Sequence, residues 1–448
     1  MHEMPDIPAY ERFLTVDELA RRATVLAETH PTLVHLVEIG RSTNGEPIRM
    51  LRIGRGEEQL LYIGCPHPNE PIGMLTIDLL AERLAASERL RGERFTWNLV
   101  LCADPDGVRL NQEWFAGPFS LSDYARGFFR PAFHEQAILT FPFEYRGRAF
   151  LNPRDETRAL MNAITALRPR FIASLHNAAL GGGYFYVSPQ TPALGEPLLA
   201  LLQDAEIPLA LGEPELPWGI EYAPAVFECT TIRAHIDYVD QLEASGDRAS
   251  IETGETTYGF AKSLCDPLFM ICEVPYFADS RIADTTPAAR SRREAMLEGS
   301  RWVDSMLTFC ETILARMHGD WSSENPYHRS VAAIIRGALR AERSLREWAG
   351  RSPEIDVPAT VAQAYSSCLE TPFYHLLNVG TLRRALAFEC HAPHRQGSRN
   401  VSECLADVEE RFLGWLKVLE EQIDYRIVPI ADLVRVQLES SLMAINTL

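Results

Sequence analysis

The chain of 448 residues has little positive charge, with 43 Lys and Arg against 61 Asp and Glu and a formal net charge of −18. Nucleic acids and anionic membranes attract proteins through clustered Lys and Arg side chains. We therefore expect neither nucleic acid nor a membrane surface as a partner of this protein.

Targeting and anchoring signals are also missing from the sequence. The first residues, MHEMPDIPAYERFL, contain neither a positive segment nor an apolar core, so they predict no signal peptide. No stretch of about 18 apolar residues occurs, which argues against a transmembrane helix. The nine cysteines form no CxxC pair, a pattern typical of reduced thiols. These absences predict a cytoplasmic protein rather than a secreted one.

Apolar residues make up 46% of the chain, enough for a substantial core. Over residues 1–317, short apolar runs alternate with helical patterns, which is typical of an α/β domain. Strands are predicted at 34–40, 49–54, 59–65, 96–101, 170–176 and 267–276, and helices at 72–90 and 154–169. The step Asn44–Gly45 between the first two strands predicts a hairpin turn.

Strand signals almost disappear after residue 317. Residues 330–348 and 401–425 have apolar positions at helical spacing, so we interpret 318–448 as an all-helical appendage. We expect its apolar stripe to pack on the first domain, with a homodimer interface or a lid over a cleft as less favoured alternatives.

Two pairs of the form His-x-x-Glu occur, and with 12 His and 61 acidic residues chance alone supplies one or two. His35 and Glu38 lie in a predicted strand, where side chains three apart point to opposite faces. His67 and Glu70 lie between a buried strand and a helix, where residues three apart can share a face. Only the second pair therefore fits half of a metal site.

A catalytic zinc site needs three protein ligands and one open position. His176 is the best third candidate because an apolar strand ends on it and the glycine-rich stretch NAALGGG follows. His134 is a rival, although no predicted strand delivers it. A His at a strand end can equally be a structural residue.

A base near the metal is the remaining requirement for hydrolysis. Glu273 fits because it is a lone carboxylate in the apolar strand FMICEVPYF, and such groups are rarely buried without a partner or a task. The alternative role for Glu273 is a buried ion pair with an Arg.

Five segments, in this order, resemble the zinc carboxypeptidases of the M14 (carboxypeptidase A-like) family. They are LVEIGRSTNGEPIRMLRIG, GCPHPNEPIG, ADPDGVRLNQEW, RDETRALMNAITALRPRFIASLHN and ICEVPYF. The resemblance covers about residues 10–315 and implies a mixed, mostly parallel sheet flanked by helices. It implies Zn²⁺ held by His67, Glu70 and His176, with Glu273 as general base and acid and an Arg sharing the developing negative charge.

The sequence departs from the family pattern in two places. Asp104 stands where the family's Asn-Pro-Asp-Gly motif begins with Asn. The Asn-Arg pair that grips the substrate's terminal carboxylate has no clear match. The candidates for this receptor are Arg126, Arg130, Arg146, Arg148 and Arg154, among which we favour Arg130. Tyr258 is a loose match to the family's mobile substrate-capping Tyr, and we also expect Asn177 to contact the substrate.

The sequence therefore predicts a zinc-dependent peptidase that removes a C-terminal residue from a peptide. A zinc amidohydrolase acting on an acyl amino acid or small amide is the alternative. A non-catalytic peptide-binding relative is less favoured, because all three ligands and the base are present.

Overall fold

The computed structural model describes residues 7–117, 119–189, 191–242, 253–392 and 399–448. Its main feature is a twisted sheet with the strand order β1-β2-β4-β3-β7-β12-β9-β11-β10. These strands are β1 (Val34–Arg41), β2 (Pro47–Gly54), β3 (Glu58–Ile63), β4 (Phe95–Val100), β7 (Phe171–His176), β9 (Tyr184–Val187), β10 (Glu221–Ala223), β11 (Val226–Glu228) and β12 (Leu268–Glu273). Each of the predicted strands is present.

The sheet is mixed, and its centre is parallel. β4, β3, β7 and β12 run in the same direction, whereas β1, β2 and β10 pair antiparallel with their neighbours. β9 is antiparallel to β12 and parallel to β11, so parallel and antiparallel pairings are equally frequent. The predicted hairpin joins β1 to β2, with Gly45 at a positive φ of 86°. The parallel centre brings the carboxyl ends of β3, β7 and β12 to one edge of the sheet.

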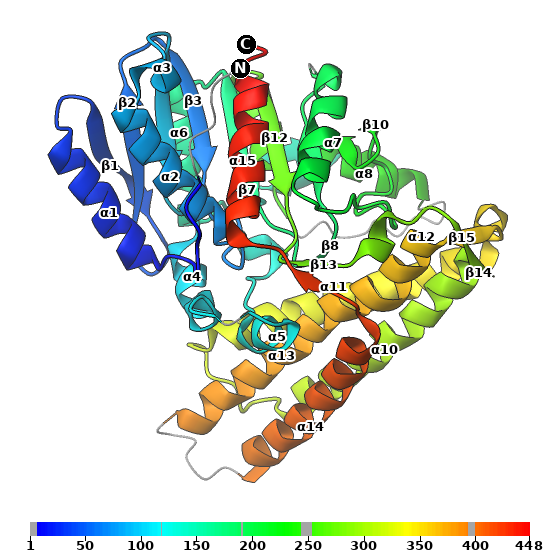
Figure 1. The fold of residues 1–448 in the computed structure, drawn as a ribbon. Coiled ribbons are helices and arrows are strands. Elements are labelled where there is room, and N and C mark those ends of the chain that lie inside the picture. The colour runs from blue at the N-terminus through cyan, green and yellow to red at the C-terminus, as the bar shows by residue number, and fades with distance from the viewer. Residues whose placement is uncertain (1–6, 118, 190, 243–252, 393–398) are drawn as a thin grey trace.

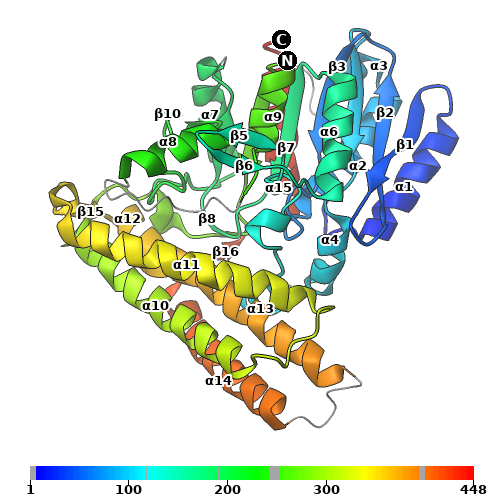
Figure 2. The same ribbon diagram turned by 180° about the vertical axis from the view of Figure 1, so that it is seen from behind.

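Helices cover both faces of the sheet. α1 (Val16–Thr29), α2 (Ile72–Ala86), α7 (Gly195–Asp204) and α15 (Ile430–Ile445) pack over one face, seen in Figure 1. α6 (Asp155–Leu167) and α9 (Thr257–Leu264) pack over the other, seen in Figure 2. The predicted helices 72–90 and 154–169 correspond to α2 and α6.

Long helices gather beyond the carboxyl ends of the central strands (Figure 1). We call α10 (Arg292–Arg316), α11 (Pro326–Arg351), α12 (Val361–Tyr365), α13 (Thr371–His391) and α14 (Arg399–Gln422) the helical region. A single π-helical turn, Ser366–Glu370, joins α12 to α13. Predicted helices 330–348 and 401–425 lie in α11 and α14, so the α/β fold with a C-terminal helical region is confirmed.

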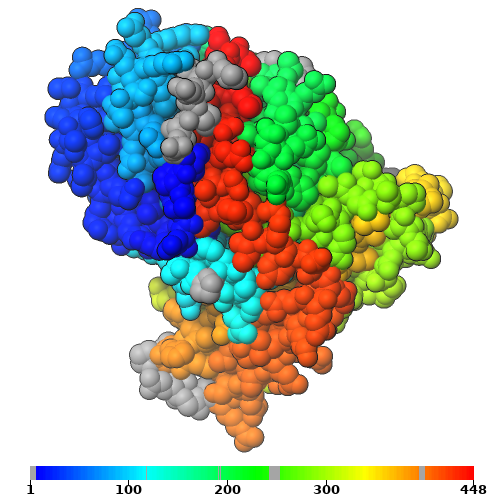
Figure 3. Space-filling model, viewed as in Figure 1, coloured from blue at the N-terminus to red at the C-terminus, as the bar shows by residue number. Residues whose placement is uncertain are grey.

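The C-terminal helix does not stay with the helical region. α15 returns to the sheet and packs on α2, β7 and β12, and Figure 3 shows these red residues between the blue and green parts of the surface. α10, which precedes residue 318, packs instead with α11 and α13. The division of the chain into units 1–317 and 318–448 stays a prediction.

The remaining elements are short. They are α3 (Glu88–Arg91), α4 (Pro105–Asn111), α5 (Leu121–Gly127), α8 (Ile232–Leu242), β5 (Phe143–Tyr145), β6 (Arg148–Phe150), β8 (Leu180–Gly181), β13 (Phe277–Ala278), β14 (Pro287–Ser291), β15 (Pro358–Thr360) and β16 (Arg426–Ile427). β8 and β13 directly follow β7 and β12 and pair with each other. Within the described residues, none of the helices has the length and apolar content needed to cross a membrane.

Candidate metal centre

His67, Glu70 and His176 converge at the carboxyl ends of two adjacent parallel strands. His67 and Glu70 lie in the connection between β3 and α2, and His176 is the last residue of β7. One potential ligand atom from each residue lies within 4.8 Å of the others. The two imidazole rings are 5.0 Å apart between centroids and inclined at 71°. The structure therefore brings together the three residues that the sequence proposed as ligands.

A tight turn and a close helix–strand contact produce this arrangement. Cys65 adopts a positive φ of 44°, and the Glu70 amide donates to the His67 carbonyl at 3.1 Å. Gly73 in the first turn of α2 lies so close to Leu175 that an added Cβ would be 2.9 Å from the Leu175 Cβ. The start of α2 can thus approach β7, which places Glu70 beside His176.

The three side chains fit a zinc ion. Their residues are only 7%, 2% and 4% exposed, yet His67 Nδ1 and His176 Nε2 have no hydrogen-bond partner, and Glu70 Oε2 lies 3.0 Å from His176 Nδ1. Buried polar atoms without partners are costly, and a shared cation would satisfy them. Two imidazoles and one carboxylate form a ligand set that catalytic zinc uses. His134 is exposed and lies outside this cluster.

Glu273 stands beside the metal cluster. It ends β12 and is the register partner of His176 on β7, and its Oε1 lies 3.4 Å from His176 Nδ1. Among the described residues, Glu273 forms no ion pair with Arg or Lys, so the alternative of a buried ion pair with an Arg is not realised. Burial raises the pKa of Glu273 well above its ordinary value, and the negative charges of Glu70 and Glu215 raise it further.

Of the five candidate arginines, Arg130 is the one that reaches the cluster. Its Nη2 lies 3.0 Å from Glu70 Oε1. The other four are paired elsewhere: Arg126 with Glu409, Arg146 with Asp237 and Asp240, Arg148 with Asp240, and Arg154 with Glu135 and Glu156.

The two other predicted substrate contacts have different outcomes. Asn177 follows His176 and is buried, with its amide donating weakly to the Val274 carbonyl at 3.4 Å and its Oδ1 unpaired. Tyr258 is only 3% exposed, packs on Phe269 at 5.4 Å and accepts from Lys262. The apolar side of α9 holds this ring in the core on the α6 face of the sheet, and the mobile cap at Tyr258 stays a prediction.

Several residues near Glu273 escaped sequence analysis. Tyr184 is the register partner of Glu273 on β9, and its hydroxyl donates to Glu215 at 3.2 Å. From the helical region, the Tyr374 hydroxyl accepts from the Ala179 amide at 3.1 Å, in the connection that follows His176. Glu370 approaches Gly181 so closely that a Cβ there has no room. No sequence motif identifies these residues, because they come from segments far apart in the sequence.

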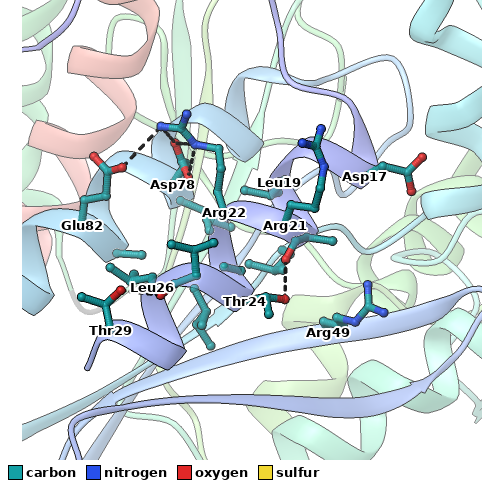
Figure 4. A pocket seen from close by; sticks show the side chains of 17 residues that line it. Asp17, Leu19, Arg21, Arg22, Thr24, Leu26, Thr29, Arg49, Asp78 and Glu82 are labelled. Carbon is teal, nitrogen blue, oxygen red and sulfur yellow. Dashed lines mark hydrogen bonds and ion pairs between the residues drawn. The ribbon is translucent and has the colours of Figure 1, made fainter. Parts of the chain in front are cut away.

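A surface hollow of about 780 Å³ lies elsewhere. It is formed by α1, α2 and β2, and Arg22 spans it to reach Asp78 at 2.8 Å and Glu82 at 3.3 Å (Figure 4). None of the residues of the metal cluster lines it. Its size therefore does not identify the reactive site.

A family model described as zinc carboxypeptidase matches residues 21–206, the part that contains His67, Glu70, Arg130 and His176. This family uses Zn²⁺, and the cluster of His67, Glu70 and His176 is able to hold that ion. Glu273 lies beyond the matched residues.

Solved structures similar to the chain include carboxypeptidase A from Helicoverpa armigera, with 14% identity and a TM-score of 0.41, covering 59% of this chain and 65% of that one. A metallo-carboxypeptidase from Burkholderia cenocepacia matches with 15% identity and a TM-score of 0.35, covering 61% of this chain and 62% of that one. The chain thus spans slightly less than two thirds of both structures. No curated protein sequence matches the chain.

Proposed function

We propose that this protein is a zinc-dependent peptidase that hydrolyses the C-terminal peptide bond of its substrate. The observation that carries the proposal is Glu273, a carboxylate only 12% exposed and without an ion-paired Arg or Lys among the described residues, 3.4 Å from one of the three candidate zinc ligands. A buried carboxylate in this position is costly to stability and is typical of a residue with a chemical task.

Zinc held by His67, Glu70 and His176 would supply Lewis acidity, which polarises a carbonyl and makes water more acidic. Hydrolysis adds one water across the C–N bond. In our proposal, Glu273 takes a proton from the water that attacks the carbonyl carbon. It then gives that proton to the departing amine nitrogen as the C–N bond breaks, so a carboxylate product and a free amino acid result.

Arg130 is our candidate receptor for the terminal carboxylate of the substrate. Its guanidinium already lies 3.0 Å from a carboxylate oxygen of Glu70, and its side chain remains 30% exposed. A planar guanidinium binds carboxylates through paired hydrogen bonds, which Lys cannot reproduce.

Hydrolysis of an acyl amino acid or a small amide is the second candidate. The observation that favours it is the pairing of Arg126, Arg146, Arg148 and Arg154 with other carboxylates, which leaves one candidate cation beside the cluster. A single guanidinium suits a small substrate with one carboxylate as well as a peptide.

The test compares zinc-loaded protein on peptides with a free C-terminal acid, the same peptides with a C-terminal amide, and acyl amino acids. Loss of one residue from the free-acid peptides alone supports the proposal. Cleavage of acyl amino acids alone supports the second candidate. Inertness toward all three contradicts both.

Glu273→Gln tests the proposed base. We expect zinc content to be retained and kcat to fall by at least about 100-fold, because Gln cannot accept the proton. Glu255→Gln is the matched control, since Glu255 is also a buried carboxylate but lies outside the metal cluster. Hydrolysis by Glu273→Gln at the wild-type rate would contradict this role.

A further inference from the structure

In the loop that carries Arg130, every backbone carbonyl accepts a hydrogen bond from a side chain. We call Gly127–Pro131 the Arg130 loop. Its five consecutive carbonyls all accept side-chain hydrogen bonds: Gly127 from Arg384, Phe128 from Arg384 and Thr381, Phe129 from Asn111, Arg130 from Ser330, and Pro131 from Gln136. Loops usually leave such carbonyls to water. This loop is instead held in one conformation.

The helical region supplies the donors for three of these five carbonyls. Ser330 belongs to α11, and Thr381 and Arg384 belong to α13, which packs against α5 just before the loop. Figure 1 shows α5 directly beside α13. The region therefore reaches the loop from two helices that are about 200 to 250 residues away in the sequence.

Arg384 makes the most extensive of these contacts. Its Nη1 donates to the Gly127 carbonyl at 2.6 Å and the Phe128 carbonyl at 3.2 Å, and its Nη2 donates to the Leu110 carbonyl at 2.7 Å. The side chain is only 11% exposed, and the nearest carboxylate, Glu113, is 3.8 Å away. This nearly buried guanidinium thus binds backbone carbonyls at the ends of α4 and α5, and its Nη2 also donates to the Tyr327 hydroxyl of α11 at 2.9 Å.

A second contact links the helical region to the other side of the metal cluster. The Tyr374 hydroxyl of α13 accepts from the Ala179 amide, three residues after His176. One helix thus contacts both the Arg130 loop and the connection that follows β7.

We propose that the helical region positions Arg130, with Arg384 and Ser330 as positioning residues. The inference rests on the proposed function, in which Arg130 holds the carboxylate of the substrate. A guanidinium can pair with a carboxylate only in a narrow geometry, and an error of about 1 Å far from the reacting atoms can cost about 100-fold in rate. If Arg384 only capped the helix ends, its loss would lower stability, but the effect on the rate would not depend on whether Arg130 is present.

The experiment uses the zinc-loaded full chain and the variants Arg384→Gln, Ser330→Ala and Arg130→Ala. Arg383→Gln is the matched control, because Arg383 directly precedes Arg384 on α13 but pairs with Glu409 of α14. We expect Arg384→Gln to keep its zinc and to lose about 100-fold in kcat/KM for a free-acid peptide. Ser330→Ala removes a single hydrogen bond and should lose about fivefold, which keeps the test available if Arg384→Gln does not fold.

The double variant Arg130→Ala/Arg384→Gln separates positioning from general stability. If Arg384 acts through Arg130, the double variant is no slower than Arg130→Ala alone. Additive losses would overturn the proposal, as would wild-type kcat/KM in both Arg384→Gln and Ser330→Ala. If Arg130→Ala itself is fully active, the role proposed for Arg130 fails instead.

Hydrogen exchange gives a readout that needs no turnover. We expect the amides of the Arg130 loop to exchange faster in Arg384→Gln than in wild type and Arg383→Gln, while β7 and β12 are unchanged. Equal exchange in both variants would overturn the positioning role even if the protein hydrolysed none of the substrates tested.

Discussion

At the scale of single residues, Asp104 stands where the motif that the sequence resembles begins with Asn. It caps α4, with its Oδ1 accepting from the Gly107 amide at 2.9 Å. Burial raises the pKa of Asp104 to about 7, so at neutral pH this carboxyl is protonated in about half of the folded molecules. A neutral carboxyl presents the same carbonyl acceptor as Asn.

The raised pKa of Asp104 makes stability depend on pH. The stabilisation from a bound proton is complete below the unfolded value near 3.8 and disappears as pH rises through about 7. We expect Asp104→Asn to be more stable than wild type at pH 8, by on the order of 3 kcal/mol, and little different at pH 4. Urea unfolding at both pH values measures this. Asp284→Asn, which alters an exposed carboxylate whose pKa is lowered by Thr286, should show no gain at pH 8.

Local sequence determines which site residues could be found in advance. His67, Glu70, His176 and Glu273 follow or end buried strands, and parallel strands must deliver their carboxyl ends to one edge. Tyr258 had no comparable constraint, because a helical Tyr faces core or solvent depending on which side of α9 packs. The sequence alone could not show which of the five arginines lies beside the cluster. That depends on the carboxylates with which the other four arginines pair, and these pairings are set by the tertiary fold.

At the scale of elements, α15 contacts the backbone that carries one of the candidate metal ligands. Gln437 is fully buried, donates to the His176 carbonyl at 2.7 Å and accepts from Thr76 of α2 at 2.8 Å. One side chain thus connects the strand that ends on His176 with the helix that follows Glu70. Partners that orient metal ligands commonly affect metal affinity.

We expect Gln437→Leu to lower the free energy of unfolding by about 2–4 kcal/mol, because it leaves the Thr76 hydroxyl and the His176 carbonyl without partners. Zinc affinity should fall about tenfold. The double variant Thr76→Val/Gln437→Leu should recover part of the stability but not the zinc affinity, since the His176 carbonyl remains unpaired. Thermal unfolding and competition with a zinc chelator measure the two effects, and equal recovery of both would contradict this account.

The long elements could be predicted because the spacing of apolar residues within each segment matches the period of a strand or a helix. Strands of continuous apolar residues, such as β3 and β7, and helices with an apolar stripe, such as α14, need only local sequence. β8, β13 and β16 were not predicted, because two-residue strands have no period and form only where the tertiary fold aligns them.

At the scale of the whole molecule, the C-terminal helix belongs to the packing of the α/β fold rather than to the helical region. The α15 side chains Leu433, Val434, Val436, Leu438 and Leu442 are buried in the core shared with α2. The sequence places residues 430–445 in the appendage only because strand signals almost disappear after residue 317, and a local pattern does not show which part of the fold a segment packs on. The homodimer proposed through that appendage stays a prediction.

Removing α15 should therefore unfold the protein. Five buried aliphatic side chains contribute on the order of 10 kcal/mol, which is comparable to the whole stability of a typical domain. We expect a chain that ends at Asp424 to lack a cooperative thermal transition, and the fragment 1–317 to behave in the same way because it also lacks α15. A chain that ends at Asn446, which loses only two residues beyond the helix, is the matched control and should unfold near the wild-type temperature. A cooperative transition in the fragment 1–317 would show instead that the sheet folds without its C-terminal helix and would support a domain boundary at residue 317.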